Sequence, residues 1–291
     1  MKIIESIEEM QQYSIQLKSN GKTLANVSTT GFLHKGHLRL VDIAKENADE
    51  VVLNIDHIDT YRKFKQEPHK YDKYLDEYRT EQLDKDLELC EKHGVDIFFH
   101  PDIHKVYISQ TNQIHSNIKK LRTSYPGVHF VDPNISKSNL KDFNMMMPDI
   151  IMMGQKDIIQ NLEAQYMITD FNYPIKMIMA PIVRESDGLA SSSRLELLSE
   201  SERKDARSIY ESLKHIEEWV QQPNVPSVGD MKDYIRNRIT EANGSVNYLV
   251  ACCAVTLEEL RYFDRKAVIV ISATFGENIV LTDNIIIELP K

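Results

Sequence analysis

The sequence predicts an α/β fold in which a parallel sheet, covered by helices on both faces, is followed by a smaller α+β domain. Helix and strand patterns alternate through the first 185 residues, which is typical of a doubly wound parallel sheet. A long helical stretch then ends near Gln222, in a segment with two prolines, and a helix and three strand patterns follow. We therefore expect a first domain at residues 1–184 and a second at residues 185–291.

The spacing of apolar residues predicts each element. Apolar residues that recur every three or four positions indicate helices, and short apolar runs between turn residues indicate buried strands. The segment 104–145 fits neither pattern clearly. In the first domain, helices are expected at 5–19, 36–48, 80–94 and from about 158, with strands at 23–29, 50–55, 95–101, 175–183 and within 148–157. In the second domain, strands are expected at 247–255, 267–275 and 278–289.

The composition argues against several classes of partner. The formal net charge is −9 and Lys and Arg are scattered, so no basic stripe is available to bind a nucleic-acid backbone. No stretch reaches the ~18 apolar residues of a membrane span, and the N-terminus lacks the apolar core of a signal peptide. We expect a cytoplasmic protein that acts on small molecules, with neither nucleic acid nor membrane as a partner.

The stretch GFLHKGHLRLV, residues 31–41, places two histidines three apart where a predicted strand gives way to a helix. The N–H groups at a helix N-terminus attract phosphate, and Gly31 and Gly36 permit close approach of the backbone. The imidazoles of His34 and His37 can donate hydrogen bonds to phosphate oxygens that gain charge when the α-phosphorus is attacked. The motif predicts a phosphate clamp, although from these residues alone a helix start with two surface histidines is equally open.

Two later segments carry further polar residues. GQKD, residues 154–157, follows a predicted buried strand, so Lys156 and Asp157 are expected at the carboxyl edge of the sheet, where doubly wound folds bind ligands. Lys156 could contact phosphates or a carboxylate, and Asp157 a ribose hydroxyl. The Gly/Ser-containing segment VRESDGLASSSR, residues 183–194, could order over a triphosphate. Taken alone, GQKD favours an ordinary surface turn, and VRESDGLASSSR could be just a linker.

Five segments in a fixed order span nearly the whole chain: GFLHKGHLRLV, GVDIFFHP, PDIIMMGQKDIIQ, VRESDGLASSSR and LTDNIII. Together they resemble the pantothenate synthetase (pantoate–β-alanine ligase) family, part of the HxGH nucleotidyltransferase superfamily. The resemblance implies a Rossmann-like first domain, a smaller C-terminal lid and a homodimer. It also implies that ATP activates a carboxylic acid as an acyl-adenylate, with release of pyrophosphate, before an amine displaces AMP.

The resemblance also implies roles for single residues. Asp86 matches a carboxylate that helps to hold Mg²⁺ on the triphosphate, although Lys85 stands where a second acidic residue is usual. The metal is expected to be held through the substrate phosphates. The other matches are His34 and His37 at the nucleotide, with Gly36 between them; Lys156, Ser192, Ser193 and Arg194 at the phosphates; Gly154 and Asp157 near the ribose; and Gln160 at pantoate. Of these, His34, His37, Lys156 and Arg194 are the expected catalytic residues.

The acid pocket departs from the family pattern. Thr30 replaces a methionine that packs beside pantoate, and Thr60 stands where a second pantoate-binding glutamine is usual. His57 lies in the same loop as Thr60 and joins Thr30, Thr60 and Gln160 in the expected pocket. Because hydrogen bonds to a substrate hydroxyl discriminate strongly, we expect an acid other than, or in addition to, pantoate.

Three more residues belong to the altered region. Asp56 and Asp59 add acidic character to the loop of His57 and could receive a cationic group or face solvent. The family stretch Arg-Pro-Gly-His-Phe-x-Gly-Val survives only as YPGVHFVDPN, with His129 as the nearest equivalent of its histidine. A genuine pantothenate synthetase with a rebuilt pocket is the near alternative.

Two other classes share the nucleotide motif. A nucleotidylyltransferase would transfer AMP to a phosphate or alcohol as the final product, but the DGLASSSR and LTDNIII segments argue against it. A non-catalytic ATP-binding relative would have no task for His34, His37, Lys156 and Arg194, all of which are present. Release of pyrophosphate that depends on a carboxylic acid would exclude the non-catalytic alternative.

Overall fold

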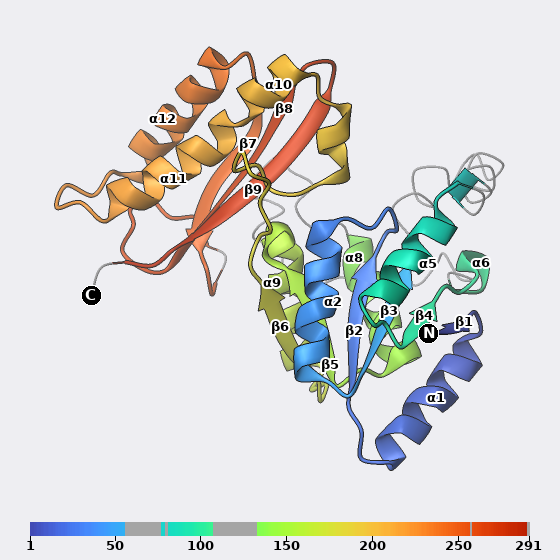
Figure 1. The fold of residues 1–291 in the computed structure, drawn as a ribbon. Coiled ribbons are helices and arrows are strands. Elements are labelled where there is room, and N and C mark those ends of the chain that lie inside the picture. Colours follow the sequence, from blue (N-terminus) through green and yellow to red (C-terminus); the bar gives the residue numbers. More distant parts are fainter. Residues whose placement is uncertain (56–76, 79–80, 107–132, 257, 290–291) are drawn as a thin grey trace. The chain divides into compact units, whose positions relative to one another are not determined.

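The computed structural model describes residues 1–55, 77–78, 81–106, 133–256 and 258–289 (Figure 1). The described residues form two compact units, and the boundary lies between Pro181 and Ile182. No helix in these described ranges is long and apolar enough to cross a bilayer.

The first unit is built on a six-stranded sheet in which every strand pair is parallel. The order is β1-β4-β3-β2-β5-β6, so β2 lies between β3 and β5. From β2 the chain adds β3 and β4 on one side and β5 and β6 on the other, so the strand order reverses beside β2. In such folds ligands bind at this point, at the carboxyl ends of the strands. The strands are β1 (Lys2–Ile4), β2 (Leu24–Thr29), β3 (Glu50–Ile55), β4 (Ile97–Phe99), β5 (Ile150–Gly154) and β6 (Lys176–Ala180).

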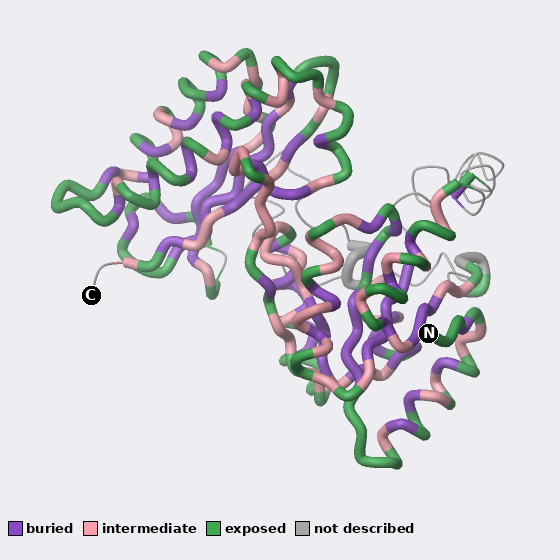
Figure 2. Tube along the Cα trace, viewed as in Figure 1, coloured by how far each residue is buried: buried purple, intermediate pink, exposed green. Residues whose placement is uncertain are grey.

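Helices cover both faces of this sheet because the strands carry apolar side chains on both faces. Val27 and Leu53 pack with α2 and α5, whereas Leu24, Val52 and Ile151 pack on the face of α1, α8 and α9. In Figure 2 the central strands are accordingly buried along most of their length. The helices of the first unit are α1 (Ile7–Ser19), α2 (Lys35–Asn47), α5 (Leu83–Lys92), α6 (Ile103–Val106), α8 (Pro133–Met146) and α9 (Ile158–Asp170), with the 3₁₀ turn η1 (Gln155–Asp157).

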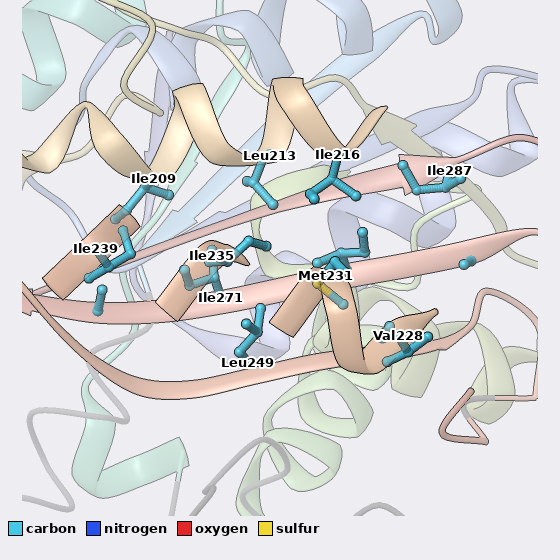
Figure 3. Packing of buried hydrophobic residues seen from close by; sticks show 14 of the residues in the cluster. Ile209, Leu213, Ile216, Val228, Met231, Ile235, Ile239, Leu249, Ile271 and Ile287 are labelled. Atoms are coloured by element: carbon cyan, nitrogen blue, oxygen red, sulfur yellow. The ribbon is translucent and has the colours of Figure 1, made fainter. Parts of the chain in front are cut away.

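The second unit is an α+β structure with an antiparallel sheet in the order β7-β8-β9. Apolar residues of α11 and α12 pack against one face of the sheet, and Leu213, Ile216 and Met231 are almost completely buried there (Figure 3). The elements are η2 (Ser193–Leu197), α10 (Glu200–Ala206), α11 (Ser208–Val220), α12 (Val228–Glu241), β7 (Ser245–Cys253), β8 (Ala267–Phe275) and β9 (Ile279–Ile287). The predicted fold class, a parallel α/β sheet followed by a smaller α+β part, is confirmed.

Candidate active site

The HxGH segment lies where β2 ends and α2 begins. His34 is the N-cap of α2, and its Nδ1 accepts the Gly36 N–H at 3.1 Å. A Cβ at position 36 would lie 2.9 Å from Cε1 of His34, so glycine is needed for this ring position. The rings of His34 and His37 stack with their centroids 4.0 Å apart and 25° between the planes. The two histidines therefore form one compact pair at the N-terminus of a helix.

The geometry indicates the protonation of the pair. Burial, together with the smaller effects of His34 and of the charge of Lys156, lowers the pKa of His37 to about 3. His37 is thus neutral near pH 7. Because Nδ1 of His34 accepts a hydrogen bond, a neutral His34 carries its proton on Nε2. Neutral imidazoles at a helix N-terminus can donate hydrogen bonds to a phosphate, and an incoming anion would favour their protonated form.

The lowered pKa of His37 predicts loss of stability in acid. Between the ordinary value of 6.5 and the folded value of about 3, the unfolded chain binds the proton and the folded chain does not. The contribution of the neutral His37 to the free energy of unfolding is therefore complete above pH 6.5. It is lost as the pH falls toward 3, by at most about 1.4 kcal/mol per pH unit. In denaturant titrations at several pH values, the free energy of unfolding of His37→Gln should fall less steeply below pH 6.5 than that of the wild type. Parallel pH profiles for the two proteins would count against a neutral His37 in the folded protein.

The end of β5 supplies the second group of predicted residues. β5 pairs with β2 through Met152 and Val27, so its carboxyl end lies beside that of β2. The turn η1 follows directly and carries Lys156, whose charge acts on His37. The structure thus brings together His34, His37 and Lys156, from segments far apart in the sequence.

The remaining predicted residues at this edge differ in exposure. Thr30 and Asp157 are exposed, and Gln160, in the first turn of α9, is partly buried. A Cβ at Gly154 would meet open space, so packing does not require glycine there. The carbonyl of Gly154 accepts a hydrogen bond of 2.9 Å from Asn161, a buried residue that sequence reasoning missed.

Asp86 does not fit its predicted role as a Mg²⁺ ligand. It is completely buried, and its carboxylate accepts four hydrogen bonds, from the N–H groups of Phe32 and Leu33, the Tyr78 hydroxyl and the Gln82 amide. A carboxylate with both oxygens engaged twice has little capacity left for a cation. Among the residues that the structure describes, no group of three or more His, Cys, Asp or Glu could hold a metal ion. Sequence reasoning missed Tyr78 and Gln82, which carry no motif.

The second unit contains the VRESDGLASSSR segment. Arg184 forms a two-pronged ion pair with the buried Asp283, at 2.7 and 3.2 Å, and its guanidinium lies 4.7 Å from the centre of the Tyr210 ring. Gly188 has a φ of +92° and the Tyr210 ring directly against its Cα, which leaves no room for a side chain. Arg184 therefore stabilises the start of this segment within the second unit. The expectation that the segment orders over a triphosphate stays a prediction.

The predicted phosphate-binding residues follow at the end of that segment. Ser192 caps η2 by accepting the Arg194 N–H at 3.3 Å. Ser193 and Arg194 are exposed, and Nη1 of Arg194 donates to the Val280 carbonyl at 3.1 Å. Five residues of the acid-pocket prediction lie outside the described residues: Asp56, His57, Asp59, Thr60 and His129.

Comparison with known proteins identifies the family. The model of the pantoate-beta-alanine ligase family matches residues 2–286, nearly the whole chain. The chain belongs to this family.

Individual members of the ligase family agree with this assignment. The pantothenate synthetase of Thermotoga petrophila is 34% identical to the chain, and the match covers 99% of this chain and 100% of that protein. The pantothenate synthetase of Thermoanaerobacter sp. is also 34% identical, and the match covers 95% of each chain. The solved pantothenate synthetase of Thermus thermophilus has a TM-score of 0.78 at 24% identity, over 98% of this chain and 99% of that one. A pantoate-beta-alanine ligase of Francisella tularensis, solved with beta-gamma ATP and beta-alanine, has a TM-score of 0.70 at 22% identity, over 98% and 97%. The sequence matches give the family, and the structural matches give the fold.

Proposed function

We propose that the chain is an ATP-dependent, AMP-forming ligase that joins pantoate to β-alanine. The membership of the pantoate-beta-alanine ligase family over residues 2–286 and the names of the 34% identical relatives support these substrates. The observation that carries the chemistry is the stacked pair of His34 and His37 at the N-terminus of α2, beside the charge of Lys156.

The arrangement suits attack at the α-phosphorus of ATP. A carboxylate oxygen of the acid forms a bond to that phosphorus, and the bond to the bridging oxygen breaks, so that pyrophosphate leaves. Nε2 of His34, the neutral His37 and the helix N-terminus stabilise the charge that develops on the phosphate oxygens. Lys156 adds a positive charge at the same edge of the sheet. The amine then attacks the acyl carbon, loses a proton and displaces AMP, which leaves an amide.

A second candidate function differs only in the acid. Thr30 lies exposed at the end of β2, where the family resemblance leads us to expect a methionine beside pantoate. A smaller and more polar residue there favours a different or additional acid. Magnesium held through the triphosphate, binding of phosphate by Ser192, Ser193 and Arg194, and a homodimer stay predictions from the resemblance. A cytoplasmic location stays a prediction from the sequence pattern.

The decisive experiment measures release of pyrophosphate and free AMP with ATP, Mg²⁺ and β-alanine. Pantoate is compared with a panel of hydroxy and amino acids, and reactions without acid or without β-alanine serve as controls. Equal release of both products that requires pantoate and β-alanine is the expected result. Release with another acid alone would establish the second candidate. Pyrophosphate release with AMP retained on the product would indicate a nucleotidylyltransferase, and no release with any acid would contradict the proposed ligase.

A further inference from the structure

The loop between β2 and α2 has an unusual backbone. Gly31 has a φ of +79° and Phe32 a φ of +52°, so two consecutive residues are in the left-handed region. That conformation is unfavourable for a residue with a side chain. Burial of the Phe32 side chain does not account for it, because this side chain is 44% exposed. Other contacts must hold the loop in place.

Those contacts come from Asp86 in α5. Its Oδ2 accepts the N–H of Phe32 at 2.9 Å, and its Oδ1 accepts the N–H of Leu33 at 3.0 Å. The same carboxylate is held from the other side, since Oδ2 accepts from the Tyr78 hydroxyl at 2.7 Å and Oδ1 from the Gln82 amide at 2.9 Å. Asp86 has no exposed surface. Hydrogen bonds to a buried, charged acceptor are among the stronger ones in proteins, so this contact can hold a strained loop.

Tyr78 supports the loop from the same direction. Its ring is 1% exposed and lies so close to Gly31 that a Cβ there would be 2.7 Å from Cε2 of the ring. The Phe32 ring lies 5.6 Å from it, centroid to centroid. The backbone at 31–33 is therefore fixed by one carboxylate and one ring, immediately before His34 begins α2.

We propose that Asp86 is a positioning residue: by binding the Phe32 and Leu33 N–H groups, it holds the loop so that His34 caps α2 and stacks on His37. This role replaces the Mg²⁺ ligation expected from the sequence. Only its effect on the reaction rate rests on the proposed function, because the geometry of the histidine pair exists in the free protein.

The test compares Asp86→Asn with Asp84→Asn, which removes a carboxylate from an exposed position of the same helix. In Asp86→Asn the amide NH₂ faces two of the four donors, so two hydrogen bonds are lost without a change of volume. NMR titration of the imidazoles in the free, folded protein should show the pKa of His37 moving from about 3 toward 6.5 as water reaches the ring. The kcat for pyrophosphate release should fall about 10- to 100-fold, since small misplacements of catalytic groups are costly. The Mg²⁺ concentration for half-maximal rate should not change, and Asp84→Asn should match the wild type throughout.

Three results would overturn the proposal. An unchanged His37 pKa in folded Asp86→Asn would show that the loop does not depend on this carboxylate. A rise of more than about 10-fold in the Mg²⁺ requirement, with the His37 pKa unchanged, would make Asp86 a metal ligand. If Asp86→Asn does not fold, Tyr78→Phe removes one donor and keeps the ring against Gly31, and an unchanged His37 pKa there would also count against the proposal. Because the titration needs no substrate, it decides the positioning role even if no acid supports catalysis.

Discussion

Replacing His37 with alanine should lower the kcat for pyrophosphate release by about 10²- to 10³-fold while the protein stays folded, which corresponds to about 3 to 4 kcal/mol in the barrier. The reason is that a donor held beside the developing charge is worth most where water is excluded, and the ring of His37 is held by stacking on His34 with a pKa of about 3. His34→Ala should have a similar effect on the rate. Pyrophosphate release under saturating ATP and acid, with circular dichroism of each variant, measures both.

His34 has a second role that the experiment must separate from catalysis. Its Nδ1 accepts the Gly36 N–H, so His34→Ala also removes a helix cap, at a cost of about 1 kcal/mol of stability. His34→Asn keeps an acceptor for that N–H and loses the Nε2 donor, so it should retain stability and still lose activity. His215→Ala, on α11 in the second unit, is the matched control and should change kcat by less than about twofold. Near wild-type turnover of His37→Ala would contradict the clamp.

The parts of the fold that the sequence predicted are those with local signals. The strand at 24–29, the helix at 35–47 and the strand at 50–55 each have a clear apolar period and a turn or cap at their ends. β1 was missed because its three residues carry no such period and are held by pairing with β4, through Lys2 and Ile97. α8 fell in the stretch that could not be assigned, since polar residues interrupt its apolar pattern.

The site shows the same division between local and distant information. The predicted position of Lys156 at a strand end follows from local patterning, and the pairing of β5 with β2 then brings it near His37. The role of Asp86 depends on donors from a different part of the chain, which no motif records. The helix period does give a hint, because Asp86 lies four residues before the buried Cys90 and so on the inner face of α5. A carboxylate on an inner helix face is more readily a structural acceptor than a ligand for a solvated cation.

Asp283→Ala should lower the free energy of unfolding of the second unit by about 3 kcal/mol or more, the second large effect that we expect. Asp283 lies in strand β9 with 3% of its side chain exposed, and it accepts two hydrogen bonds from Arg184. Its removal leaves Arg184, whose side chain is 25% exposed, without its anionic partner beside the Tyr210 ring. Trp219, the single tryptophan, lies in α11, so its fluorescence during urea unfolding reports on this unit.

The comparison that tests this explanation uses an exposed pair in the same unit. Asp264 contacts Arg265 at 2.8 Å with 55% of its side chain exposed, so Asp264→Ala should leave the free energy of unfolding nearly unchanged. If the cost in Asp283→Ala comes from the partly buried Arg184 charge that is left without its partner, the double variant Arg184→Met, Asp283→Leu should recover a large part of it, because apolar packing can replace an ion pair. Equal losses in Asp283→Ala and Asp264→Ala would mean that burial of the pair is unimportant. In the double variant, Arg184 no longer holds the VRESDGLASSSR segment. If the double variant recovers stability but still lacks ligase activity, the loss of activity does not come from unfolding of the second unit.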